Sequence, residues 1–114
     1  MNFADYITDI PDFPKEGVLF RDITSLLQNG EAFHAVIDQM AEQTKGLDFD
    51  VVVGAEARGF MFGSALAYKL NKAFVPVRKK GKLPRETVSA EYDLEYGTAT
   101  LEMHKDAFQP GDKV

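Results

Sequence analysis

The sequence contains no cysteine. It can therefore form no disulfide and no thiolate metal site, which is compatible with the cytosol. No run of about eighteen apolar residues occurs either, so we predict no membrane-spanning helix. The first residues, MNFADYITDIPDF, carry three aspartates and no basic start, so we expect no secretory signal. The composition, with 45% hydrophobic and 27% charged residues, is typical of a soluble globular protein, and we expect a cytoplasmic location.

Several chemical motifs are also missing. There is no GxxxxGK phosphate-binding loop, no Ser/His/Asp set in a recognisable context and no His/Cys/Asp cluster with the spacing of metal ligands. The net charge of −5 argues against a general nucleic-acid binder. Basic charge is nevertheless concentrated, because five of the 13 Lys and Arg residues lie between Arg78 and Arg85. Such a patch on an acidic protein favours a small anionic ligand over a polymer.

The segment Asp50–Phe62, DVVVGAEARGFMF, is the stretch around which we expect the fold to be organised. Its three consecutive valines form an apolar run without polar alternation, which predicts a strand covered on both faces. Gly54 and Gly59 bracket the turn that follows. In open α/β sheets ligands bind at such a turn, and its amides together with Arg58 suit an anion. A tight turn with a solvated Arg58 is equally compatible with these residues alone.

The rest of the chain alternates helical and extended patterns. In the first half of the chain the pattern predicts a short helix or arm over Met1–Ile10, a loop over Phe13–Arg21 and a helix over Glu31–Lys45 capped by Asn29. A strand over Phe49–Val53, a crossover helix over Gly59–Leu70 and a parallel strand over Ala73–Val77 should follow, and Pro76 interrupts the last strand or places it near an edge. We then expect a hairpin that pairs Thr87–Glu91 with Thr98–Met103, and a further strand that starts at Lys113–Val114. His34 lies one step off the apolar stripe of its helix, so we expect it at the surface. We therefore predict the α/β class, with a parallel sheet flanked by helices, in a single domain over residues 1–114.

The segment Arg78–Gly97 has few aliphatic anchors, so we expect its first half to be mobile. We interpret it as a lid that closes over a polyphosphate and excludes water, with Arg58 acting on the same anion. A solvated hairpin tip, or lysines that protect a sheet edge, would have the same composition. At the base of this segment lie Asp93 and Glu95. Carboxylates near a turn are usually solvated, but Glu95 is the better candidate for handling a proton of a bound base.

Four segments in register resemble one family. The segments FPKEGVLFRDIT (Phe13–Thr24), VVVGAEARGFMFG (Val51–Gly63), VPVRKKGKLP (Val75–Pro84) and YDLEYGTATLEMHKDA (Tyr92–Ala107) look like adenine phosphoribosyltransferase. The resemblance implies a type I phosphoribosyltransferase fold with an N-terminal arm and hood over 1–24 and a flexible lid or hairpin over 78–97. It implies purine salvage, in which the phosphoribosyl group of phosphoribosyl pyrophosphate passes to N9 of adenine and gives AMP and pyrophosphate. It also implies Mg²⁺ bound mainly through phosphoribosyl pyrophosphate, a homodimer, and neither nucleic acid nor a membrane as a partner.

The resemblance also assigns roles to residues of this sequence. Carried over position by position, the roles are adenine binding by Leu19, Phe20 and Arg21, pyrophosphate binding by Ala57, Arg58, Arg78 and Lys82, and catalysis by Glu95 and Tyr96. Phe20 would stack on the adenine ring, and the backbones of Leu19 and Arg21 would read its edge. The acid of the Glu95–Tyr96 pair would assist proton handling at the base. No protein residue is expected to bind the metal directly.

One part of the family pattern is absent. In the family the strand that begins at Lys113–Val114 carries two adjacent aspartates and a Thr/Gly-rich loop, which bind the ribose hydroxyls and the 5′-phosphate. We therefore expect the C-terminal part of the fold to be absent and the 114-residue chain to be an inactive fragment of a longer enzyme. The alternatives are a regulator of the same fold that senses phosphoribosyl pyrophosphate without chemistry, a transferase for another purine base, against which Phe13–Arg21 argues, and a structural α/β fragment.

Overall fold

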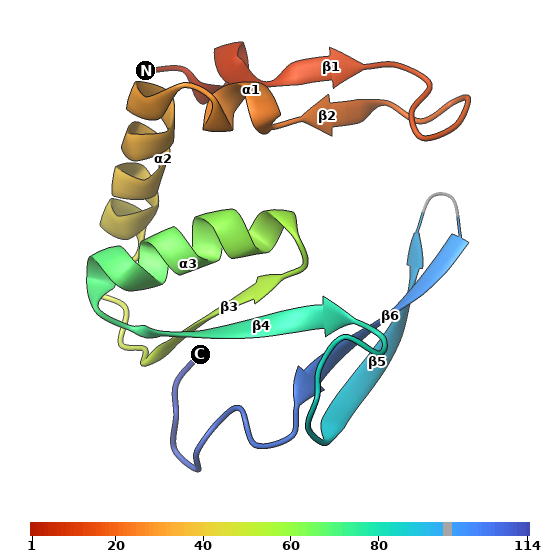
Figure 1. Cartoon of the computed structure of the whole chain (residues 1–114). Coiled ribbons are helices and arrows are strands. Elements are labelled where there is room, and N and C mark those ends of the chain that lie inside the picture. The colour runs from red at the N-terminus through yellow and green to blue at the C-terminus, as the bar shows by residue number, and fades with distance from the viewer. Residues whose placement is uncertain (95–96) are drawn as a thin grey trace. The chain divides into compact units, whose positions relative to one another are not determined.

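The computed structural model describes residues 1–94 and 97–114. The chain divides into two compact units, Met1–Gln43 and Thr44–Val114 (Figure 1). The expected single domain, with an arm and hood over 1–24, stays a prediction. None of the helices in the described part of the chain combines the length and the apolar character needed to cross a membrane.

The first unit starts with a small antiparallel pair of strands. A 3-10 helix, η1 (Phe3–Tyr6), leads into β1 (Thr8–Ile10), which pairs with β2 (Phe20–Asp22). The expected helix or arm over Met1–Ile10 therefore includes a strand, and the expected loop over Phe13–Arg21 ends in one. The chain reverses between the strands, where the backbone N–H of Phe13 donates to the carbonyl of Val18 at 3.0 Å. Strands of three residues are too short for a clear alternating pattern, which is why the sequence did not predict them.

The helical part of the first unit follows its sequence signals closely. After α1 (Thr24–Leu27) the chain forms α2 (Gly30–Gln43), near the bounds predicted from Glu31 to Lys45. The Asn29 side chain accepts a hydrogen bond from the backbone N–H of Ala32 at 3.0 Å, so the predicted cap is confirmed. His34 has a side chain that is 78% exposed and lies 3.0 Å from Asp38, one helical turn on. Its expected surface position is also confirmed.

The second unit is a mixed four-stranded sheet with one helix. Its elements are β3 (Val51–Ala55), α3 (Arg58–Leu70), β4 (Ala73–Lys79), β5 (Thr87–Leu94) and β6 (Gly97–His104), and the strand order is β3-β4-β6-β5. The predicted parallel pair is confirmed as β3 and β4, and the predicted hairpin as β5 and β6. The α/β class is therefore correct, but the sheet as a whole is mixed, because β6 joins β4 in the antiparallel direction.

Strand β4 connects the two halves of this sheet. Its first part pairs with β3, and only Arg78 and Lys79 pair with β6. The strand runs through Pro76 without a break, so the predicted interruption is wrong. Beside Pro76 no described strand pairs with the β6 side of β4, which agrees with the alternative of an edge position, where a missing N–H is tolerated.

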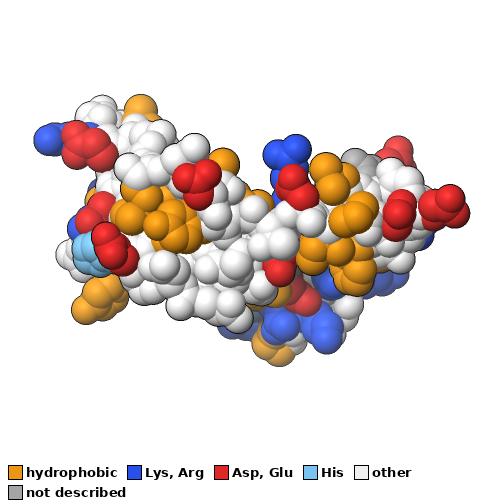
Figure 2. All heavy atoms as spheres, turned by 90° about the horizontal axis from the view of Figure 1, so that it is seen from above, with side chains coloured by type: hydrophobic (Ala, Val, Ile, Leu, Met, Phe, Trp, Pro, Cys, Tyr) orange, Lys and Arg blue, Asp and Glu red, His pale blue; other side chains and the backbone are white. Residues whose placement is uncertain are grey.

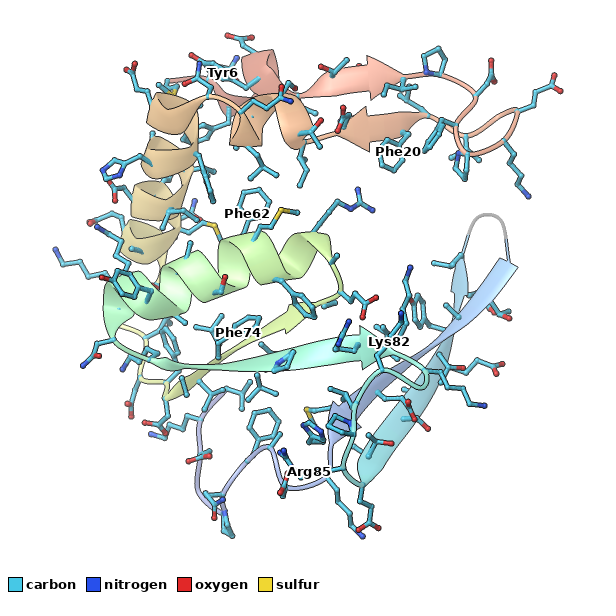
Figure 3. The ribbon with its side chains drawn as sticks, viewed as in Figure 1. Tyr6, Phe20, Phe62, Phe74, Lys82 and Arg85 are labelled. Carbon is cyan, nitrogen blue, oxygen red and sulfur yellow. The ribbon has the colours of Figure 1, made fainter. Side chains whose placement is uncertain are left out.

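Glycines let α3 approach the sheet closely. A Cβ atom on Gly54 would lie 2.6 Å from the carbonyl oxygen of Gly59 and 2.8 Å from a ring carbon of Phe74, and a Cβ on Gly63 would lie 2.7 Å from the same ring carbon. Phe74 lies between α3 and the strands (Figure 3) and meets Phe60 edge to face at 5.9 Å. The turn after β3 is therefore held against the sheet by backbone-to-backbone contact.

The predicted coverage of the valine strand is only half correct. Val51 is buried with Leu66 and Ala67, but Val53 is 37% exposed. Val51 and Val53 are two residues apart and therefore lie on the same face of β3. That face is covered at Val51 and open at Val53. The expectation of cover on both faces is wrong for Val53.

Candidate active site

The centre of the candidate site is the turn from β3 to α3. Ala57 immediately precedes the helix, and Arg58 is its first residue and is exposed. The backbone N–H of Glu56 donates to the carbonyl of Val77 at 2.8 Å, which ties the turn to β4. The first amides of a helix have no partner within the helix and carry a partial positive charge, so the turn offers donors that suit an anion. The predicted position of Arg58 in a strand–turn–helix unit is confirmed.

An ion pair joins this turn to the end of β4. The Arg78 Nε atom donates to Glu56 Oε1 at 2.9 Å, and the backbone N–H of Lys79 donates to the same oxygen at 3.3 Å. The side chains are 36% exposed for Arg78 and 14% exposed for Glu56. The hydrogen bond from Arg78 is the largest cause that lowers the pKa of Glu56, with smaller contributions from Lys79 and from the charge of Lys82. Glu56 is therefore ionised at neutral pH and holds the Arg78 side chain at the turn.

The basic segment is shorter and better anchored than the sequence suggested. Strands include Arg78 and Lys79 at its start and residues from Thr87 onward at its end, so the connecting loop is Lys80–Glu86. Glu102 on β6 accepts hydrogen bonds from the backbone N–H of Gly81 at 2.8 Å and from the Thr87 hydroxyl at 3.0 Å. These bonds lower the pKa of Glu102. The mobility of the lid stays a prediction, but both ends of the loop are attached to β6.

The far end of the loop makes further polar contacts with the segment after β6. The backbone N–H of Arg85 donates to His104 Nε2 at 3.4 Å, and its guanidinium donates to Asp106 at 3.2 Å. This last contact lowers the pKa of Asp106. Figure 2 shows basic and acidic side chains next to one another on the face it draws. Arg85 therefore has an acidic partner of its own, distinct from the Glu56 that holds Arg78.

The structure brings some of the expected anion-binding residues together. Arg78 and the charge of Lys82 act on the carboxylate of Glu56, which stands two residues before Arg58. Lys82 is exposed and lies in the loop that follows β4 (Figure 3). Arg78 is therefore bonded to the β3–α3 turn, and the action of Arg58, Arg78 and Lys82 on one anion stays a prediction.

The residues expected to bind adenine lie in the first unit. Leu19 is 51% exposed and precedes β2, to which Phe20 and Arg21 belong. The Phe20 ring meets Phe13 edge to face at 5.1 Å, and Arg21 lies 3.8 Å from Asp9. An exposed leucine next to an aromatic ring supplies apolar surface of the kind that binds a flat base.

The two expected catalytic residues, Glu95 and Tyr96, lie outside the described residues. Their neighbours Leu94 and Gly97 are paired as the last residues of β5 and the first of β6.

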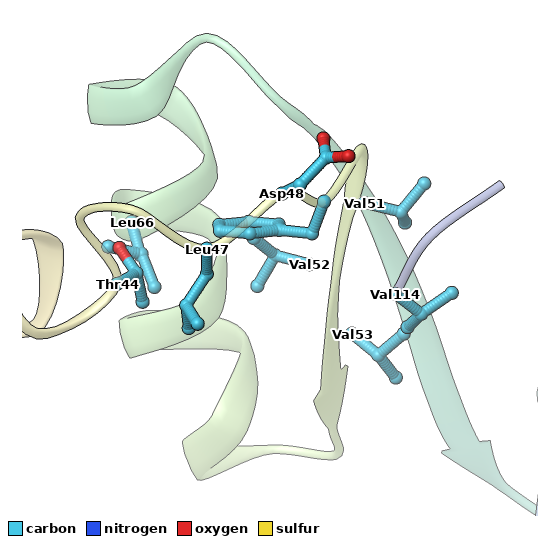
Figure 4. A pocket seen from close by; sticks show the side chains of 9 residues that line it. Thr44, Leu47, Asp48, Val51, Val52, Val53, Leu66 and Val114 are labelled. Atoms are coloured by element: carbon cyan, nitrogen blue, oxygen red, sulfur yellow. The ribbon is translucent and has the colours of Figure 1, made fainter.

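A cavity lies beside β3. It has a volume of about 510 Å³ and is lined mainly by apolar residues of the second unit, among them Leu47, Val51, Val53 and Val114 (Figure 4). Next to it the carbonyl of Lys113 accepts hydrogen bonds from the backbone N–H groups of Asp50 at 2.7 Å and Val51 at 3.2 Å. The residues predicted to start another strand therefore lie alongside β3. None of the residues that line this cavity is a basic residue of the candidate site.

Comparison with known proteins decides the family. Curated proteins named adenine phosphoribosyltransferase from Lachnoclostridium phytofermentans and Pseudothermotoga lettingae are 64% and 62% identical to this chain, over 96% and 100% of its length. The chain belongs to the adenine phosphoribosyltransferase family. It spans 63% of the length of the first relative and 67% of the second. No protein-family model matches the chain.

A solved structure agrees with this assignment at the level of the fold. The crystal structure of adenine phosphoribosyltransferase from Thermoanaerobacter pseudethanolicus is 53% identical, superimposes with a TM-score of 0.91, and is matched over 96% of this chain and 64% of that chain. The predicted type I phosphoribosyltransferase fold is therefore confirmed for the part present here.

Two carboxylates of the site, Glu56 and Glu102, were not predicted from the sequence. Glu56 lies within the glycine-bracketed turn, so its position was a usable signal, but its partner Arg78 is 22 residues away. Glu102 belongs to an alternating strand and is 21 residues from Gly81. Pairing of β4 with β6 places Glu102 opposite Arg78, and the sequence did not predict that pairing.

Proposed function

We propose that the protein to which this chain belongs acts in purine salvage and transfers the phosphoribosyl group of phosphoribosyl pyrophosphate to adenine, giving AMP and pyrophosphate. The observation that carries the proposal is the hydrogen bond of 2.9 Å from Arg78 Nε to Glu56, in the turn that leads to Arg58. Family membership supplies the reaction, since the relatives named above are adenine phosphoribosyltransferases.

Pyrophosphate binding is the role we assign to Ala57, Arg58, Arg78 and Lys82. Displacing pyrophosphate from the anomeric carbon develops negative charge on the leaving group. Fixed cations stabilise that charge, and a guanidinium can do so with two parallel hydrogen bonds to one phosphate. The N-terminus of α3 adds backbone donors beside Arg58. The loop Lys80–Glu86 is bonded to β6 at both ends, so it can position Lys82 while its middle residues keep their conformational freedom.

Adenine binding is the role we assign to Leu19, Phe20 and Arg21. The Phe20 ring would stack on the base, while backbone groups of its neighbours would form hydrogen bonds with the base edge. Glu95 would assist the proton at the base, and Tyr96 would be its aromatic neighbour. These two roles rest on the match to the family motif.

Mg²⁺ is the ion we propose to accompany the reaction, held mainly by phosphoribosyl pyrophosphate. The described residues contain no group of three or more His, Cys, Asp or Glu side chains able to hold a metal ion, so oxygens of the substrate fit this role better than the protein. When bound, the ion would neutralise part of the diphosphate charge.

We further propose a cytoplasmic homodimer, in which the basic loop of one subunit serves either its own site or the site of its partner. The 114-residue chain by itself should be inactive. The relatives are about half as long again as this chain, and the site described here contains no group assigned to the 5′-phosphate or the ribose hydroxyls.

Adenine binding tests the proposal. Calorimetric titration should show adenine binding to the chain, with a loss of about 5- to 150-fold in Phe20→Ala, because base–aromatic stacking is worth roughly 1–3 kcal/mol. Tyr68→Ala, which removes an aromatic side chain that is 89% exposed, is the matched control and should bind as the wild type does.

The same experiment separates the alternatives. A regulator would bind phosphoribosyl pyrophosphate but not adenine, and a transferase for another base would prefer hypoxanthine or xanthine in a competition series. Formation of AMP by the purified 114-residue chain would contradict its proposed inactivity.

A further inference from the structure

Arg78 is held by a carboxylate that the proposed reaction does not itself require. Glu56 is only 14% exposed, and one of its oxygens accepts hydrogen bonds from both Arg78 Nε and the Lys79 N–H. By contrast, the Arg85–Asp106 pair has side chains that are 61% and 67% exposed. Exposed pairs of that kind fix side chains weakly. The sheltered position and the two donors give the Glu56 contact a stronger orienting effect.

The way in which Glu56 binds Arg78 leaves part of the guanidinium available. A guanidinium can bind an oxyanion in two bidentate ways, along its Nε side or through its two terminal nitrogens. Glu56 contacts Nε at 2.9 Å, and the terminal nitrogens have no recorded hydrogen bond to a described residue. The edge formed by the two terminal nitrogens can therefore bind a phosphate with two parallel hydrogen bonds while Glu56 contacts Nε.

We infer that Glu56 is a positioning residue, which holds Arg78 by Nε so that its two terminal nitrogens face the diphosphate. The inference rests on the proposed function, because it assigns a purpose to Glu56 only if a diphosphate binds at this turn. Glu56 need not touch the diphosphate.

A neutral residue at position 56 should change the affinity for diphosphate in opposite directions, depending on whether Glu56 positions Arg78 or only contributes its charge. A carboxylate next to an anion site repels the anion, so on charge alone a neutral residue at position 56 should strengthen diphosphate binding. If Glu56 positions Arg78, the neutral residue should weaken binding, because Arg78 then has to be ordered by the ligand itself.

The test is an NMR titration of the ¹⁵N-labelled 114-residue chain with inorganic pyrophosphate. The wild type should bind saturably, with shifts at the Arg58 and Gly59 amides and at the Arg78 Nε–H signal. Glu56→Gln should weaken pyrophosphate binding by about tenfold or more and move the Arg78 Nε–H signal before any ligand is added. Glu91→Gln is the matched control, since Glu91 is exposed on β5 and the substitution removes the same charge. It should change affinity by less than about twofold.

A second variant tests the same contact from the other side. Arg78→Lys keeps the charge but lacks the planar fork, and it should also weaken binding by about tenfold. The double variant Glu56→Gln with Arg78→Lys should bind no more weakly than Arg78→Lys alone, because both changes remove one positioned group.

Each outcome decides the inference. Unchanged or tighter pyrophosphate binding in Glu56→Gln, with a native spectrum, overturns the positioning role and leaves the anion site intact. Absence of binding in the wild type overturns the proposed anion site and the inference with it. If Glu56→Gln loses its dispersed spectrum, Glu56→Asp decides, because it keeps the charge but shortens the side chain that holds Arg78: a tenfold loss supports the inference, and unchanged affinity overturns it.

Discussion

Replacing Gly54 or Gly63 by alanine should separate two kinds of contact between α3 and the sheet. The Cβ of Gly54→Ala would come within 2.6 Å of the Gly59 backbone oxygen. The Cβ of Gly63→Ala would come closest to the ring of Phe74, at 2.7 Å, and would lie at an ordinary contact distance of 3.7 Å from the Gly54 backbone. Real Cβ atoms essentially never lie closer than 3.0 Å to another group. Either the helix or the ring must therefore move.

The expected magnitudes follow from what has to move. Overpacking of a close contact costs about 1–3 kcal/mol, and we expect the upper part of that range for Gly54→Ala, because backbone must shift. In a chain of this size each kcal/mol lowers Tm by roughly 4 °C, so Tm should fall by roughly 8–12 °C. Gly63→Ala should cost less, because the obstacle is a side chain.

Thermal unfolding followed by circular dichroism provides the assay. Phe74→Leu removes the ring carbon that both alanines would meet, so it should relieve most of the cost of Gly63→Ala but little of the cost of Gly54→Ala. Gly30→Ala is the control, since nothing lies within 4 Å of its would-be Cβ, and it should leave Tm unchanged or raise it slightly. Equal relief of both alanines by Phe74→Leu would refute the distinction between backbone and ring contact.

Three further predictions concern single side chains. Asn29→Ala removes the cap of α2 and should lower stability by about 1 kcal/mol in chemical denaturation; no change would mean that the cap contributes nothing. Glu102→Gln should speed hydrogen exchange at Gly81, because its acceptor loses its charge, and an unchanged rate would refute the anchoring of the loop. The lowered pKa values of Glu56 and Glu102 mean that the folded state binds fewer protons than the unfolded one. Their contribution is therefore fully present above pH 4.5, the ordinary pKa of a glutamate, and is lost as pH falls through the folded pKa. Glu56→Gln should make stability fall less steeply between about pH 5 and 3, and an identical slope would contradict this.

Local patterns predicted much of the fold. The apolar spacing and the cap of α2, the βαβ unit around the three valines, and the alternation of β6 each depend on residues close together in sequence. They appeared at nearly the expected bounds. The β1–β2 pair and the junction of β4 with β6 depend on distant contacts such as Ile10 with Phe20 and Lys79 with Leu101, which periodicity does not reveal.

In the candidate site, too, the residues marked by local sequence were predicted and those that depend on distant contacts were not. Arg58 could be located from its turn, and the basic segment from its composition. The partners of the cations could not, because Glu56 and Glu102 acquire their roles only when β4 lies between β3 and β6. The mixed sheet also explains why Arg78, expected in a mobile loop, is part of a strand.

The central claim is that three cations at the β3–α3 turn bind a diphosphate. The most direct measurement is the affinity of the chain for inorganic pyrophosphate in the wild type and in Arg58→Gln, Arg78→Gln and Lys82→Gln. A charge-assisted hydrogen bond is worth about 1.5–3 kcal/mol, so each variant should weaken binding by roughly tenfold or more. Lys72→Gln, beyond the opposite end of α3, should have no effect. Equal affinity in all four variants and the wild type would contradict the claim.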